Sequence, residues 1–164
     1  MEQQNFLIGF AQLSLVLTGF VSIFVVFMID KNEKSRVNTH HAASILVGSV
    51  LTLLATLVPI VLHHYGLEGE TLWWWASAVF MGLSGSYFFC MASLTVQLSG
   101  AEFKEAGYLH MGSSYLLGFG AAAVILLNLL GPATPGHYVF ALLINMLVPL
   151  IAFVTFCAQK VFYW

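Results

Sequence analysis

The sequence carries very little charge. Among its 164 residues are five Lys or Arg and seven Asp or Glu, whereas 60% of the residues are hydrophobic. A soluble domain usually has about a quarter charged residues, and one of this size still exposes roughly 30% of the surface of its unfolded chain. So few charges cannot cover that surface. The lipid bilayer is therefore the expected surrounding of this chain and its first expected partner.

Other absences exclude classes of function. The few basic residues form no stripe that could contact a phosphate backbone, which excludes nucleic acid as a partner. Cys90 and Cys157 lie in apolar segments without a Cys-x-x-Cys or Cys/His spacing, so we expect small packing residues, not a disulfide or metal site. Hydrolase and metalloprotease motifs and a phosphate-binding glycine loop are also missing. Enzymatic activity is not expected, and the sequence requires no cofactor.

Long apolar stretches are what the chain does contain. A helix needs about 20 apolar residues to cross a hydrocarbon core of about 30 Å. The sequence therefore predicts an all-α bundle of five transmembrane helices in a single domain, 1–164. Because no basic region precedes the first stretch, we expect it to be kept as a span and not cleaved as a signal peptide. The predicted spans are 6–29, 42–65, 72–98, 108–130 and 137–159.

The linkers predict how the helices are connected. The short segments 66–71 and 131–136 are rich in Gly and Pro, so each is expected to join two antiparallel neighbours into a helical hairpin. The segment 30–40 is longer and charged. Ser99 and Glu102 have the Ser-x-x-Glu spacing of a capping box, which predicts a short turn of helix before the fourth span.

The basic residues predict an orientation. With five spans, every Lys and Arg falls on one side of the membrane, and cytoplasmic loops are the ones enriched in these residues. We therefore expect the N-terminus outside, the C-terminus in the cytoplasm, and an integral membrane location, in a bacterial inner membrane. The residues on the predicted cytoplasmic side are Lys31, Lys34, Arg36, Lys104 and Lys160.

No Asp, Glu, Lys or Arg lies in the middle of any predicted span. Proton pumps and ion-coupled carriers normally keep such a residue there, so these functions are not expected. The absence of a mid-span lysine likewise excludes a Schiff-base retinal protein. A passive channel lined by hydroxyl, amide and backbone groups remains open.

Small residues recur every fourth position on four of the predicted spans. At this spacing they share one helix face and let helix backbones approach closely, which is how helices associate in lipid. We expect most of these stripes to pack inside the bundle and some to remain for a homo-oligomer or other membrane subunits. The stripes are Ser14, Thr18 and Ser22; Ser44, Gly48 and Thr52; Ala78, Gly82, Ser86 and Cys90; and Ser114, Gly118 and Ala122.

Polar side chains within the spans are expected to form interhelical hydrogen bonds. Asn145 stands four residues before Pro149, whose ring frees the backbone carbonyl of Asn145 near a kink. Such a kink could line a pore or small cavity, for which the candidates are Asn145, Pro149, Pro59 and Gln12. The polar residues concerned are Gln12, Gln97, Asn128, Asn145, Tyr87 and Tyr115.

Six histidines fall into two sets, one near each predicted membrane boundary. His40, His41 and His110 lie at the inner boundary, and each set could supply an imidazole pair to haem or a metal ion. At about 1.5 Å per residue, His41 and His63 are about 33 Å apart on one helix, so two haems would both lie in the headgroups. The outer set, near two glutamates, is the better metal candidate, since mixed His and carboxylate ligands suit Zn or Cu. It comprises His63, His64 and His137.

Three hypotheses follow. The first is a non-catalytic multi-pass membrane protein that acts as a subunit of a larger complex or as a homo-oligomer. The second is a passive channel for a small solute. The third is a haem- or metal-binding redox subunit of the membrane.

Overall fold

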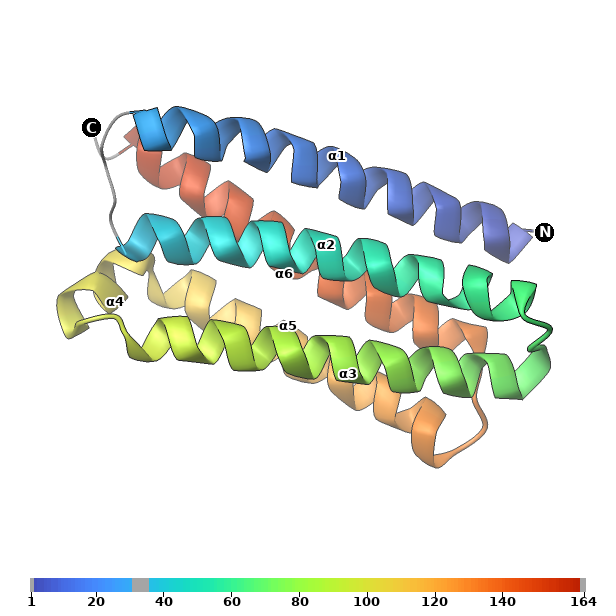
Figure 1. Ribbon diagram of the computed structural model, residues 1–164. Helices are drawn as coiled ribbons and strands as arrows, with labels where there is room; N and C mark the ends of the chain where they lie inside the picture. Colours follow the sequence, from blue (N-terminus) through green and yellow to red (C-terminus); the bar gives the residue numbers. More distant parts are fainter. Residues whose placement is uncertain (1, 31–35, 163–164) are drawn as a thin grey trace.

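The protein is a bundle of helices, seen in a computed structural model (Figure 1). The structure describes the backbone of residues 2–30 and 36–162 and the side chains of 5–20, 23, 36–108 and 110–158. Lys31 and Lys34, and the side chains of Ser22 and Lys160, lie outside these ranges. The described residues form helices and no strand: α1 Glu2–Asp30, α2 Arg36–His64, α3 Gly69–Val96, α4 Gly100–Ala106, α5 Tyr108–Leu130 and α6 Pro135–Phe162.

Four of the described helices, α2, α3, α5 and α6, are long and apolar enough to cross a membrane. The chain is therefore all-helical and has the make-up of a multi-pass integral membrane protein. In α1, the apolar stretch among the described residues is shorter, Asn5–Phe20. The count of five spans thus remains a prediction, and so does the orientation of the termini.

The four long apolar helices form one ring of contacts. Helix α2 packs against α3 and α6, and α5 packs against the same two helices, while α1 lies along α2 and also touches α6 (Figure 1). The two hairpins predicted from the linkers are confirmed, because α2 and α3 are packed neighbours, as are α5 and α6. Helix α2 contacts α1, α3, α4 and α6, and α6 contacts α1, α2, α3 and α5, so these two helices form the centre of the bundle.

The turns between helices have clear local causes. Helix α2 ends in a Schellman motif: Gly66 has a φ of 86°, its N–H donates to the His63 carbonyl, and the Leu67 N–H donates to the Leu62 carbonyl.

The predicted capping box is confirmed at α4. The Glu102 N–H donates to Ser99 Oγ at 3.3 Å and the Ser99 N–H donates to Glu102 Oε2 at 2.8 Å. This second bond holds the pKa of the Glu102 carboxyl below its usual value.

Helix α2 begins at Arg36, earlier than the predicted start at residue 42, so residues 36–40 of the segment predicted as a linker are helical. The sequence predicted a linker here because residues 36–41 are mostly polar. Hydropathy does not show which other elements pack against them. Val37 is buried against Ala106 and Met111, at the α4–α5 junction. Packing against this junction stabilises the helical form of this polar segment, so α2 starts six residues, about 1.7 turns, before the predicted residue.

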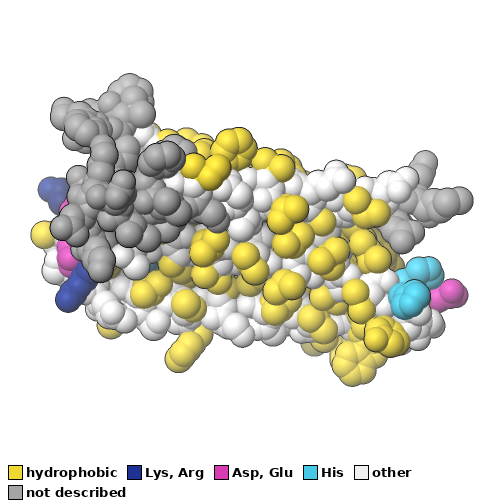
Figure 2. Space-filling model, turned by 45° about the horizontal axis from the view of Figure 1, so that its top comes forward, with side chains coloured by type: hydrophobic (Ala, Val, Ile, Leu, Met, Phe, Trp, Pro, Cys, Tyr) yellow, Lys and Arg dark blue, Asp and Glu magenta, His cyan; other side chains and the backbone are white. Residues whose placement is uncertain are grey.

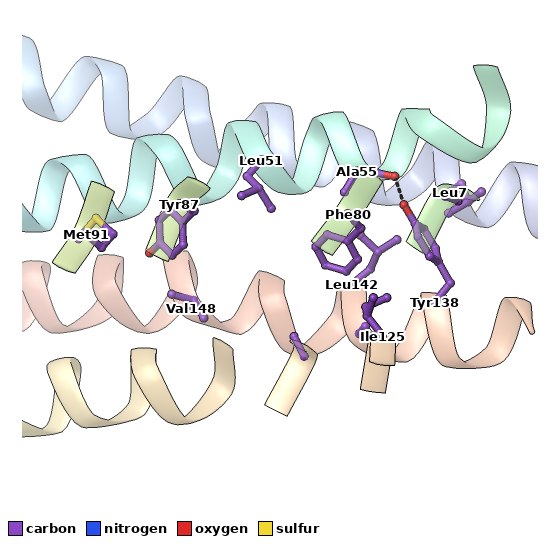
Figure 3. Packing of buried hydrophobic residues seen from close by; sticks show 13 residues of the cluster. Leu7, Leu51, Ala55, Phe80, Tyr87, Met91, Ile125, Tyr138, Leu142 and Val148 are labelled. Carbon is purple, nitrogen blue, oxygen red and sulfur yellow. Dashed lines mark hydrogen bonds between the residues drawn. The ribbon is translucent and has the colours of Figure 1, made fainter. Parts of the chain in front are cut away.

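One apolar cluster fills the bundle along most of its length. Phe80 of α3 and Tyr138 of α6 are 1% and 0% exposed, and their rings contact each other (Figure 3). The Tyr138 hydroxyl donates to the backbone carbonyl of Ala55, the bond drawn as a dashed line in Figure 3. This bond satisfies the one polar atom of the largest fully buried side chain, and it joins α6 to α2 in the core.

The surface is divided along the bundle axis. In the view of Figure 2, hydrophobic side chains cover the middle of the molecule, and charged side chains lie at its two ends. We call the end that carries Arg36, Glu102 and Lys104 the α4 end. The end that carries Glu68 and Glu70 is called the opposite end. Such an apolar belt between charged ends fits a protein surrounded by lipid.

Candidate functional site

Three histidines meet inside the bundle at the α4 end. His40 and His41 lie near the start of α2, and His110 lies in the first turn of α5. Their exposures are 3%, 0% and 0%. The ring centroids are 4.5 Å apart for His41 and His110, 6.0 Å for His40 and His110, and 6.4 Å for His40 and His41. We call these three residues the histidine cluster.

The histidine cluster is only partly hydrogen-bonded. His40 Nε2 lies 3.0 Å from Thr95 Oγ1, and His110 Nδ1 lies 3.5 Å from Ser114 Oγ. His40 Nδ1, His110 Nε2 and both ring nitrogens of His41 are buried without a hydrogen-bond partner in the protein. A buried polar atom left in this state costs about 1–3 kcal/mol. The cluster is therefore able to accept a ligand that contacts nitrogen.

A small cavity adjoins the histidine cluster. The surface that faces this cavity is mainly apolar. The lining hydroxyl groups are hydrogen-bonded: Ser44 Oγ lies 3.2 Å from the Tyr87 hydroxyl, and the Tyr115 hydroxyl lies 3.1 Å from Thr95 Oγ1. The space inside, about 10 Å³ for the centre of a water molecule, is the room that one water needs. The lining residues are His40, Ser44, Tyr87, Phe88, Met91, Met111, Ser114 and Tyr115.

The outer histidines, the metal site predicted from the sequence, lie at the opposite end. His137 Nδ1 is 2.9 Å from Asn128 Oδ1, which can only accept, so His137 donates there. His63 Nδ1 approaches the Leu67 carbonyl at 3.4 Å, and His64 is exposed beside Tyr65. Across the described side chains, no three His, Cys, Asp or Glu residues are arranged to hold one metal ion. The outer site therefore stays a prediction without geometric support.

The predicted cavity-lining residues do not share one site. Gln12 is exposed on α1, whereas Asn145 and Pro59 are buried. Asn145 Nδ2 donates to Thr52 Oγ1 at 2.9 Å. Pro149 packs on Gly48, since a Cβ added there would lie 3.5 Å from the Pro149 ring. The Pro149 segment of α6 is thus packed against α2, and the structure adds no support for a channel at this place.

The expected interhelical bonds of the polar residues are confirmed for four of the six. Asn128 bonds Ser77, Asn145 bonds Thr52, Tyr87 bonds Ser44, and Tyr115 bonds Thr95. Gln97 instead donates to the Ser93 carbonyl of its own helix, and Gln12 is exposed.

Sequence reasoning placed the three inner histidines at one boundary but did not identify the histidine cluster as the better site. The capping box at Ser99 predicted the short helix α4, but not that the junction of α4 and α5 packs against the start of α2 and places His110 beside His40. The methionines of the cavity carried no signal, since their spacing resembles ordinary core positions. Comparison of the chain with protein families, curated proteins and solved structures finds no match.

Proposed function

We propose that this chain is a non-catalytic multi-pass membrane protein that works by packing against other membrane helices, as a homo-oligomer or as a subunit of a larger complex. The observation that supports this proposal is the outward face of α3. Gly82, Gly85, Ser86 and Cys90 are all exposed there. A Cβ added at Gly82 or at Gly85 would meet nothing within 4 Å.

Two of the other small-residue stripes are already used within the bundle, which makes the α3 face distinct. Gly48 of α2 packs on Pro149 of α6, and Gly118 of α5 lies directly under the ring of Phe88 from α3. Small residues in lipid favour close helix association because they let backbones approach and gain dispersion contacts. The α3 stripe has the same composition but no partner in the described chain, so we assign it to another helix.

The arrangement that we propose for this module has five spans, with α1 as the first. Helix α1 packs along α2 for much of its length (Figure 1), which is the position of a spanning neighbour. The described basic side chains, Arg36 and Lys104, both lie at the α4 end, whereas Glu68 and Glu70 lie at the opposite end. The positive-inside rule then favours a cytoplasmic α4 end.

Cys90 allows a direct test of self-association. It lies on the α3 stripe and is exposed, so two copies that pack through this face would bring two Cys90 thiols together. In native membranes, the variant Cys157→Ala, which keeps Cys90, is expected to form a cross-linked dimer with a short bis-thiol reagent. The variant Cys90→Ala, which keeps Cys157, is expected to stay monomeric on the same gel.

Larger side chains on the outward face of α3 should reduce the cross-link. In the Cys157→Ala background, the double substitution Gly82→Leu and Gly85→Leu is expected to reduce dimer yield at least fivefold, because leucine holds the backbones apart. Gly112→Leu on α5 is the matched control, since Gly112 is also exposed with nothing within 4 Å of an added Cβ. Two results together would contradict the proposal: no cross-linked dimer in the membrane, and no other chain that copurifies after mild extraction.

A further inference from the structure

We propose that the histidine cluster and its adjoining cavity form a site for one monovalent copper ion, Cu(I), bound by imidazole nitrogens of His40 and His110 and by the thioethers of Met91 and Met111. His40, Met91 and Met111 line the same cavity. His110, on α5, does not line it, but its ring contacts the ring of His40. This site goes beyond helix packing and does not depend on it.

The hydrogen bonds of the two histidines match those of metal ligands. A histidine that binds a metal uses one ring nitrogen for the ion and holds the other by a hydrogen bond, which fixes the ring orientation. His40 has Nε2 held by Thr95 and Nδ1 unpartnered. His110 has Nδ1 near Ser114 and Nε2 unpartnered. Each ring therefore has one fixed nitrogen and one available.

The kind of donor selects the ion. Met91 and Met111 offer soft thioether sulfurs, and soft ligands favour Cu(I) over harder divalent metals. The described side chains that line the cavity include no carboxylate. A divalent ion would therefore keep its full charge in a buried site, whereas Cu(I) would bring a single charge. Among the described residues, the histidine cluster included, no three His, Cys, Asp or Glu are arranged to hold one metal ion. An ion bound here therefore needs the thioether sulfurs as ligands beside the imidazoles.

The dimensions suit a single small ion. The cavity offers about the room of one water molecule, too little for haem or an organic cofactor. Two imidazoles that share a metal at a nitrogen distance of about 2.0 Å have ring centroids about 5–6 Å apart. The centroids of His40 and His110 are 6.0 Å apart, which is at the upper end of that range.

His41 has a supporting position. Its ring is fully buried, contacts His110 at 4.5 Å and Phe156 at 6.0 Å, and has no hydrogen bond from either nitrogen. The His41 ring therefore lies between His110 and Phe156 of α6. We therefore expect His41 to hold the His110 ring in place, or to replace it as a ligand when His110 is substituted.

The test is a titration of the purified full-length chain in detergent micelles with Cu(I), without oxygen, in competition with a coloured Cu(I) chelator. We expect one Cu(I) per chain. Met91→Leu and Met111→Leu, which nearly conserve volume, are each expected to weaken binding at least tenfold, and His40→Gln more strongly. Met81→Leu on α3 and His63→Gln on α2 are the matched controls and should bind as the wild type does.

Two further measurements keep the outcome clear. X-ray absorption at the copper edge should show both nitrogen and sulfur neighbours, with the sulfur signal lost in the Met91→Leu, Met111→Leu double variant. Thermal unfolding without metal shows whether each variant is folded, and Ag(I) should raise the melting temperature of the wild type but not of the double variant. Binding well below one Cu(I) per chain, or binding unchanged in the folded double variant, overturns the proposal. A Zn(II) site independent of both methionines would overturn it equally.

Discussion

At the scale of single residues, Asn128 shows how the bundle satisfies a polar group in an apolar surrounding. Its side chain is fully buried, and all four of its hydrogen-bonding positions are used. Nδ2 donates to Ser77 Oγ at 3.1 Å and to the Thr134 carbonyl at 3.0 Å. Oδ1 accepts from the Thr134 N–H at 3.0 Å and from His137 Nδ1 at 2.9 Å. One amide thus joins α5, α3 and the turn into α6.

Asn128→Asp is expected to destabilise the protein by about 1–3 kcal/mol, because the carboxyl group keeps the shape but loses the two N–H donors. The Thr134 carbonyl would then lack its donor, and Ser77 would have to donate its own hydroxyl hydrogen to keep a bond. Thermal or denaturant unfolding in detergent micelles measures the change. Ser77→Ala removes one of the four bonds and should cost less. Equal stability of Asn128→Asp and the wild type would show that the network contributes little.

The sequence predicted that Asn128 and Asn145 would bond across helices, because an amide in lipid has no other way to satisfy its donors. It did not predict the partners. Ser77 and Thr52 are small hydroxyl residues like many others in the chain, and only the packing of α3 on α5 and of α2 on α6 brings them to the amides. For the histidine cluster the limit was the same, since the sequence gives a depth in the membrane but not a neighbour.

At the scale of helices, hydropathy predicted the long elements well and the ends poorly. The spans 108–130 and 42–65 correspond to α5 and α2, but α2 begins at Arg36. Its first turns bury Val37, His40 and His41 against α4 and α5. Tertiary packing, which no window average contains, determines this boundary and thereby brings the cluster histidines into the bundle.

The contact between α3 and α5 depends on a glycine. A Cβ added to Gly118 would lie 1.8 Å from the tip of the Phe88 ring. That ring stacks on Phe119 at a centroid distance of 5.5 Å and on Tyr115 at 6.4 Å. The Phe88 ring of α3 therefore occupies a notch on α5, the space above Gly118 that a Cβ atom would fill.

Gly118→Ala is expected to force Phe88 out of this notch and to destabilise the bundle by about 1–3 kcal/mol, the usual cost of overpacking. The measurement is the melting temperature in detergent micelles. Gly112→Ala, on the same helix with nothing within 4 Å of an added Cβ, is the control and should not lower it. If Phe88→Ala restores the stability of the Gly118→Ala variant, the contact between the added methyl group and the Phe88 ring causes the loss of stability. If Gly118→Ala and Gly112→Ala have the same melting temperature, the space above Gly118 does not contribute to stability.

At the scale of the whole molecule, the distribution of charge and of apolar surface agrees with one orientation of the bundle in the membrane. The apolar belt of Figure 2 separates an α4 end with Arg36 and Lys104 from an opposite end with Glu68 and Glu70. The histidine cluster lies at the α4 end. If that end is cytoplasmic, as we propose, the cluster faces the reducing side of the membrane, where copper is available as Cu(I). The orientation therefore bears on both proposals.

Cysteine labelling in intact cells can decide the orientation and the span count together. In a background without Cys90 and Cys157, Tyr65→Cys and Pro132→Cys are exposed at the opposite end and should react with a membrane-impermeant maleimide. Ala101→Cys, exposed on α4, should react only after permeabilisation, because the basic residues keep its end inside.

Asn5→Cys then tests α1 alone. If α1 crosses the membrane, Asn5 lies on the same side as Tyr65, since α2 crosses back, and it should be labelled in intact cells. If α1 lies along the inner surface, Asn5 should react only after permeabilisation, with Ala101. That result would leave four spans and a cytoplasmic N-terminus. Labelling of Ala101→Cys from outside would instead reverse the whole frame and place the histidine cluster at the outer end of the bundle.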